Sequence, residues 1–177
     1  GRGQRITISA IYYTRSSDYK SAKHATDFWN NKKDLKYTSK DGTTFSVCFK
    51  LSVKSSKNPV NDAQLESDMG NSYEIVKDLG RDAYGNIING GTRKDRHIQV
   101  IQSRSDSETG AHEVGHSLMI TPETCSEHTE TGIMTRSSSD TNRSDQVSQE
   151  TVNTIVESNG FEQKNRSIWS RIVSLFE

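Results

Sequence analysis

Alternation of apolar and polar residues predicts two long strands in the first third of the chain. Residues 5–14 (RITISAIYYT) are rich in Ile, Tyr and Thr and alternate roughly with a period of two, which is typical of a strand. Every second residue across 45–53 is apolar, and this predicts a strand with one buried face over residues 43–54. Asp41-Gly42 indicates a turn just before that strand.

Apolar residues at helical spacing predict helices that alternate with shorter strands. Residues 97–102 (HIQVIQ) are typical of a strand, and the next segment is expected to form a helix capped by Ser105, Asp106 or Ser107 and ended by Thr121-Pro122. Frequent Gly residues between positions 55 and 91 indicate loops with one or two short strands, such as 73–79. The predicted helices cover residues 21–31, 105–119, 147–160 and 162–177.

Length and composition indicate one folded domain with a thin core. The 177 residues suit one domain, and we expect this domain over residues 1–160 with an amphipathic extension over 161–177. Leu, Ile, Val and Phe make up 34 residues, about 19% of the chain, which lies at the compositional edge of disorder. Disorder also requires a large net charge, whereas this chain has 23 basic and 23 acidic residues. A bound metal would help to stabilise such a core.

The balance of charge bears on partners and location. A net charge of zero and a pI near 7.1 argue against nucleic acid or an anionic membrane as partner. No window approaches the roughly 18 apolar residues that a membrane-spanning helix needs. The sequence begins with Gly1-Arg2-Gly3 rather than Met, so we expect a processed or excised fragment that is secreted or exported, with its signal outside the sequence.

One motif carries specific chemistry. His112, Glu113 and His116 form H-E-x-x-H inside a predicted helix, where a separation of four residues places both imidazoles on one face, able to bind one Zn²⁺. Zinc lowers the pKa of a coordinated water to about 7, and an adjacent carboxylate can accept its proton during attack on a peptide carbonyl. The motif therefore predicts metal-assisted hydrolysis with Glu113 as general base.

A catalytic zinc site needs a third protein ligand beyond this helix. His128 is the leading candidate because it follows Pro122, where the chain can turn back under the metal. Glu150 on the next predicted helix is the rival, and it would give a thermolysin-like peptidase. His24 and His97 are expected to be structural or exposed and are left outside the site.

Two segments together resemble the metzincin clan of zinc peptidases. The first is HEVGHSLM at residues 112–119, and the second is EHTETGIMT at residues 127–135, in which GIMT is similar to the Met-turn of this clan. The order of predicted elements is also that of the clan, so the resemblance covers residues 5–160. It implies an α/β metzincin-like zincin with a twisted mixed sheet, an active-site helix, a Met-turn and a C-terminal helix.

The resemblance also implies roles for single residues. Met134 would lie beneath the zinc as a packing floor, His128 would complete a three-histidine site, and Glu113 would be the general base. The clan's long consensus has Gly and then the third His where this chain has Met119 and Pro122, so an insertion before the third ligand must be assumed. No Tyr follows Met134 directly, as it does in some members, and no oxyanion stabiliser is assigned.

These observations predict a zinc-dependent endopeptidase that acts on protein or peptide substrates, with an extended substrate paired to the edge of the sheet. A polar, Ser-rich peptidase unit without its own signal also looks similar to toxin modules of large bacterial polymorphic proteins, which implies a cognate immunity protein. The alternative from another class is a non-catalytic binding module stapled by zinc. Cys125, three residues before His128, would be its fourth ligand; otherwise Cys125 is a buried thiol or is disulfide-bonded to Cys48.

Overall fold

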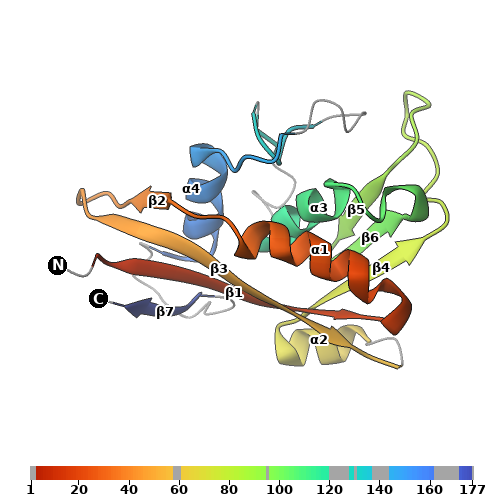
Figure 1. The fold of residues 1–177 in the computed structure, drawn as a ribbon, viewed down its shortest axis with the longest axis horizontal. Coiled ribbons are helices and arrows are strands. Elements are labelled where there is room, and N and C mark those ends of the chain that lie inside the picture. Colours follow the sequence, from red (N-terminus) through yellow and green to blue (C-terminus); the bar gives the residue numbers. More distant parts are fainter. Residues whose placement is uncertain are drawn as a thin grey trace.

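The computed structural model describes residues 3–57, 61–94, 96–119, 128–129, 131–136, 144–161 and 172–176. The protein belongs to the mixed α/β class, and parallel and antiparallel strands share one sheet (Figure 1). The elements in chain order are β1 (Arg5–Thr14), the 3-10 helix η1 (Ser16–Asp18), α1 (Tyr19–Asn30), β2 (Leu35–Thr38), β3 (Thr44–Ser55), α2 (Asp62–Asp68), β4 (Asn71–Val76), β5 (Gly90–Arg93), β6 (His97–Ile101), the 3-10 helix η2 (Gln102–Arg104), α3 (Thr109–Leu118), α4 (Gln149–Ser158) and β7 (Ile172–Phe176).

β1 lies at the centre of the sheet, whose strand order is β2-β3-β1-β4-β6-β5 with β7 beside β1. β1 pairs in parallel with β3 along its whole length, and the two strands lie side by side in Figure 1. Its other edge pairs in parallel with β4 through residues 12–14 and antiparallel with β7 through residues 5–8. β4 and β6 are also parallel, whereas β2 and β5 at the two ends of the order are antiparallel to their neighbours.

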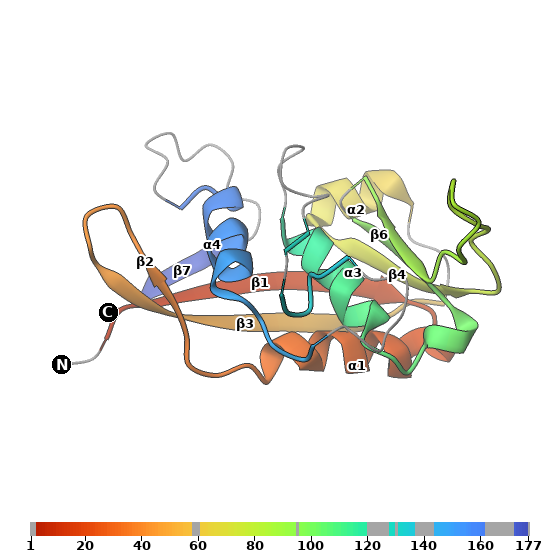
Figure 2. The ribbon, with the colours of Figure 1, turned by 90° about the horizontal axis from the view of Figure 1, so that it is seen from above.

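The core lies between the sheet and the helices on one of its faces. In β1 the even-numbered residues are buried, as the period of two requires, and the apolar ones belong to the same core cluster as Ala22, Ala25 and Trp29 of α1. Trp29 of α1 is fully buried and its ring centroid lies 5.1 Å from that of Phe49 in β3. Figure 2 shows α1 and α2 on opposite sides of the sheet. The opposite face is contacted by the segment after α2, because a Cβ at Gly70 would lie 2.8 Å from the Tyr13 ring.

Most predicted elements are confirmed. The strands expected over residues 5–14, 43–54 and 97–102 correspond to β1, β3 and β6, and the helices expected over 21–31 and 147–160 correspond to α1 and α4. β2 and α2 were not predicted. The helix expected over 162–177 is wrong for residues 172–176, which form strand β7 and pair with β1. Thr121 and Pro122, expected to end the helix before them, lie outside the described residues.

No helix within the described ranges is both long and apolar enough to span a bilayer.

Candidate metal centre

Helix α3 carries the H-E-x-x-H motif and is buried on all sides, because every residue from Thr109 to Leu118 is buried. The helix begins later than the predicted residue 105. Its N-cap position is Glu108, whose side chain makes no capping hydrogen bond, and the Ser107 hydroxyl accepts from the Thr109 backbone N–H at 3.2 Å. Of the three predicted caps, Ser107 is thus the one that bonds to the first turn.

Three buried polar contacts hold α3 in place, each from a different part of the chain. The indole Nε1 of Trp29 in α1 donates to the carbonyl of Ala111 at 2.9 Å. Tyr12 Oη of β1 lies 2.7 Å from Ser117 Oγ. Asn159 Nδ2, just after α4, donates to the carbonyl of Leu118 at 2.8 Å. Buried hydrogen bonds of this kind fix orientation as well as position.

Two glycines let α3 approach its neighbours closely. A Cβ at Gly110 would lie 2.3 Å from the Tyr73 hydroxyl oxygen and 3.1 Å from Ala25 Cβ. A Cβ at Gly115 would lie 2.3 Å from Met134 Sδ. The two distances of 2.3 Å are far below van der Waals contact. Only glycine therefore fits at residues 110 and 115 without a shift of the neighbouring side chain.

The structure brings together the three histidines predicted as ligands. One ligand nitrogen from each of His112, His116 and His128 lies within 4.8 Å of the others. The Nε2 atoms of His112 and His116 are 3.1 Å apart, and the ring centroid of His128 lies 5.3 Å from that of His112 and 4.8 Å from that of His116. His112 and His116 are buried, whereas His128 is half-buried.

A backbone carbonyl fixes the orientation of the first imidazole. His112 Nδ1 lies 2.8 Å from the carbonyl oxygen of Ile133, and a carbonyl can only accept, so Nδ1 carries a proton. In a neutral imidazole the lone pair is then on Nε2, which faces His116. Metal-binding histidines in proteins usually have such a hydrogen bond on the nitrogen away from the metal.

Residues 131–136 form a turn against α3. The Thr129 N–H donates to the carbonyl of Met134 at 3.1 Å, and Gly132 adopts a φ of 88°, a conformation that favours glycine. The Ile133 N–H donates to the carbonyl of Gln146 at 2.8 Å. Met134 is fully buried, and its sulfur lies against Gly115. The Ile133 carbonyl therefore contacts His112, and the Met134 side chain contacts Gly115 three residues further along the same helix.

Glu113 is held by strand β5. Its side chain is 6% exposed, and its Oε2 accepts a hydrogen bond from the Thr92 hydroxyl at 2.7 Å. The same hydroxyl lies 3.0 Å from the backbone carbonyl oxygen of Glu113. A Cβ at Gly90 would lie 3.1 Å from Glu113 Cγ. The carboxylate that the sequence assigns as the base therefore lies at the interface between α3 and the edge strand.

The donor set fits a transition-metal ion. Three imidazoles are ligands that Zn²⁺ uses in catalytic sites, with N–metal distances of about 2.0–2.1 Å. Ligand nitrogens in such a tetrahedral site are separated by about 3.3 Å, close to the 3.1 Å between the Nε2 atoms of His112 and His116. The cluster, with His112 oriented by Ile133, is therefore able to hold a metal ion.

Other residues considered from the sequence lie apart from the cluster. Glu150 is exposed in the first turn of α4 and is not in the metal-ligating group found among the described residues. Cys125 lies outside the described residues. Cys48 is a free thiol 3.3 Å from Thr7 Oγ1. His24 is exposed and 3.8 Å from Glu108 Oε1, whereas His97 is half-buried and its Nδ1 lies 2.9 Å from Ser72 Oγ.

Sequence reasoning missed the groups that support these residues. Gly90 falls in the predicted loop region and Thr92 in no predicted element, although the run Asn89-Gly90-Gly91-Thr92 is a signal for a place where two backbones approach. The Ile133 carbonyl is a main-chain group, and no side-chain pattern predicts its role. Trp29 lies in the helix predicted over residues 21–31, but no local pattern predicts its hydrogen bond to Ala111.

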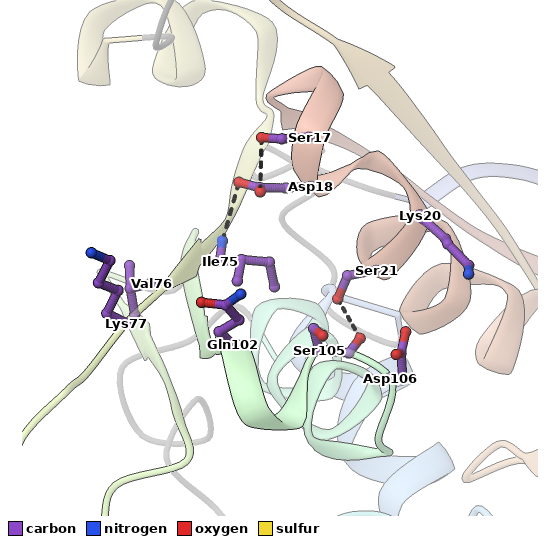
Figure 3. Close-up of a pocket in the computed structure, with 10 residues that line it drawn as sticks. All are labelled: Ser17, Asp18, Lys20, Ser21, Ile75, Val76, Lys77, Gln102, Ser105 and Asp106. Carbon is purple, nitrogen blue, oxygen red and sulfur yellow. Dashed lines mark hydrogen bonds between the residues drawn. The ribbon is translucent and has the colours of Figure 1, made fainter.

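A separate cavity of about 490 Å³ lies at the carboxyl end of β4, beside the first turn of α1 and the segment after η2 (Figure 3). Asp18 is buried there and accepts from Ser17 Oγ and the Ile75 N–H, while the Ser21 hydroxyl donates to the Ser105 carbonyl. The residues that line the cavity include none of the three histidines.

Fold and site together define a mixed α/β protein in which a buried helix and a turn after it bring three histidines together. No protein-family model matches the chain, and no curated protein matches it.

Proposed function

We propose that this protein is a zinc-dependent endopeptidase of metzincin type, which hydrolyses peptide bonds of protein substrates. The observation that carries the proposal is the gathering of His112, His116 and His128, whose ligand nitrogens lie within 4.8 Å of one another. Two of them share helix α3 with Glu113, which occupies the position of the general base in H-E-x-x-H peptidases.

Each residue has a defined task in this proposal. The three imidazoles hold the zinc, and the Ile133 carbonyl keeps His112 in the tautomer that presents Nε2. When bound, zinc polarises the carbonyl of the scissile peptide bond and makes a water molecule more acidic. Glu113 accepts a proton from the attacking water and then donates it to the leaving amine. Met134 packs under α3 and keeps the helix and the turn at a fixed separation.

The edge of the sheet supports the choice of an extended peptide as substrate. β5 is the last strand in the described order and is antiparallel to β6, and Thr92 of β5 contacts Glu113. A peptide added as a strand along this edge would run past the carboxylate, which is a common way in which proteins bind extended chains. Export, a toxin role and an immunity protein as partner stay predictions from the sequence.

The test is the Glu113→Ala variant, measured for zinc content and for cleavage of a proteome-derived peptide mixture by mass spectrometry. We expect zinc at wild-type stoichiometry and a loss of cleavage of roughly 10²–10⁴-fold, because the change removes a base and no ligand. Glu150→Ala is the matched control, since this exposed glutamate has no role in the proposal. Wild-type protein that binds zinc but cuts no peptide in the mixture would contradict the proposed function.

A further inference from the structure

We infer that Thr92 is a positioning residue that fixes the carboxylate of Glu113 from the edge strand. The inference rests on the proposed function and deepens it. Its basis is the hydrogen bond from the Thr92 hydroxyl to Glu113 Oε2 at 2.7 Å, the usual length of an O–H···O hydrogen bond.

The hydroxyl is attached to a rigid part of the fold. Thr92 lies in β5 opposite Ile98 of β6, and Ile98 is fully buried. A β-branched side chain in a strand has few rotamers, so the hydroxyl direction follows from the backbone. The Glu113 carbonyl oxygen at 3.0 Å is a second acceptor for the single proton of this hydroxyl, and it belongs to the helix backbone. The carboxylate is therefore held relative to α3 and β5 together.

Gly90 makes this close approach of strand and helix feasible. Residues 90 and 92 of β5 lie on the same face of the strand, and a Cβ at residue 90 would lie 2.8 Å from Thr109 Cγ2 and 3.1 Å from Glu113 Cγ. Glycine at 90 and threonine at 92 thus have complementary effects. The first leaves room for the stem of Glu113, and the second supplies a donor for its carboxylate.

A base held in this way needs less reorganisation before proton transfer. Small misplacement of a catalytic group costs about two orders of magnitude in rate. Without the donor, the Glu113 side chain gains rotamer freedom at the interface. The hydroxyl acts through Glu113, and the zinc ligands are the imidazoles of other residues, so the metal content is not expected to depend on Thr92.

The experiment compares Thr92→Val, Thr92→Ser and Thr38→Val in the full chain. Valine keeps the shape of threonine and removes the donor, serine keeps the donor, and Thr38 is the matched control because it lies on β2 at the opposite end of the strand order. The first readout is the ¹³C NMR signal of the Glu113 carboxyl carbon in metal-free protein, assigned with Glu113→Gln. The second is kcat/KM of the zinc-loaded protein on a peptide that the wild type cuts.

We expect the ¹³C chemical shift of the Glu113 carboxyl carbon to change in Thr92→Val. The shift should keep its wild-type value in Thr92→Ser and Thr38→Val. We expect kcat/KM to fall by about 10- to 100-fold in Thr92→Val alone, with zinc content unchanged. An unmoved carboxyl signal, or wild-type kcat/KM in Thr92→Val, would overturn the inference. If instead the wild type cuts no peptide, the proposed function fails, and the catalytic role of Thr92 fails with it.

Discussion

The sulfur of Met134 occupies the space that a side chain at Gly115 would need. A Cβ at residue 115 would lie 2.3 Å from Met134 Sδ, and Met134 is fully buried. The glycine between the two motif histidines therefore has a packing function, which the H-E-x-x-H pattern alone does not specify.

The Gly115→Ala substitution is expected to destabilise the protein. Alanine favours a helix by about 1 kcal/mol over glycine, but overpacking costs about 1–3 kcal/mol, and the rigid Trp29 ring would also lie only 3.0 Å from the new Cβ. We expect a net loss in the free energy of unfolding, measured by urea denaturation. Gly91→Ala is the control, because a Cβ there meets nothing within 4 Å. In a Met134→Ala background the Gly115→Ala change should cost less than in the wild type; equal costs in the two backgrounds would speak against the contact.

The choice between His128 and Glu150 as the third metal ligand can be tested by measuring the zinc content of variants. We expect His128→Ala to lose stoichiometric zinc, because its imidazole belongs to the cluster, and Glu150→Ala to retain it. Zinc that binds the folded state also raises the apparent stability, so the rise in melting temperature on zinc addition should disappear in His128→Ala. The reverse pattern, with zinc lost in Glu150→Ala, would restore the thermolysin-like assignment.

Because the Tyr73 hydroxyl has a raised pKa, we expect the protein to lose stability at alkaline pH. Burial raises the pKa of its hydroxyl to about 12 from the usual 10.0; the hydrogen bond with Ser21 acts in the opposite direction, and the charges of Glu113 and Asp18 add to the rise. The neutral form is thus favoured in the folded state, so this contribution to stability is complete below pH 10 and is lost as the pH rises to about 12. The loss amounts to roughly 3 kcal/mol.

Denaturant unfolding at a series of alkaline pH values measures this effect. Tyr73→Phe removes the ionisable group, and its stability should vary less over the window; Ser21 keeps its bond to the Ser105 carbonyl at 2.6 Å. Tyr84→Phe, at a residue 90% exposed, should behave as the wild type. Parallel curves for Tyr73→Phe and wild type would show that Tyr73 titrates at its usual pKa.

Asp41, in the turn before β3, is expected to titrate at an unusually low pH. Hydrogen bonds from the Ser39 hydroxyl and from the Thr43 N–H, the latter at 2.9 Å, lower the pKa of Asp41 to about 2 from 3.8. The charged form is favoured, so the turn is stabilised above pH 3.8 and loses this contribution as the pH falls toward 2. NMR titration of the Asp41 carboxyl carbon should give the low midpoint. Ser39→Ala should raise it; an unchanged midpoint would exclude the Ser39 bond as its main cause.

The sequence predicted the long elements and the identity of the gathered histidines. Strict alternation in β1 and β3, and the four-residue spacing of His112 and His116, are local patterns, and local patterns suffice for such elements. The proximity of His128 followed from the general need for a third ligand. Its position was thus a chemical inference, which the geometry of the cluster agrees with.

Features that depend on distant contacts were not predictable. Residues 172–176 have the apolar spacing of an amphipathic helix, but they form β7 because an edge of β1 at residues 5–8 accepts a strand. β2 is only four residues long, too short for a periodic signal. Thr92 contacts Glu113 across 21 positions of sequence, and the glycines before Thr92 indicate a close approach without identifying Glu113 as the partner.

The order of elements along the chain bears on how the protein matures. Tyr12, Trp29 and Tyr73, which contact α3, all come before Thr109 in the sequence. Because a ribosome delivers the N-terminus first, these three contacts of α3 emerge from the exit tunnel ahead of His112 and His116, whereas His128 and the supporting Asn159 follow later. A nascent chain therefore brings the three imidazoles together only after most of the sheet has been synthesised, so an ion held by all three would be bound late in synthesis.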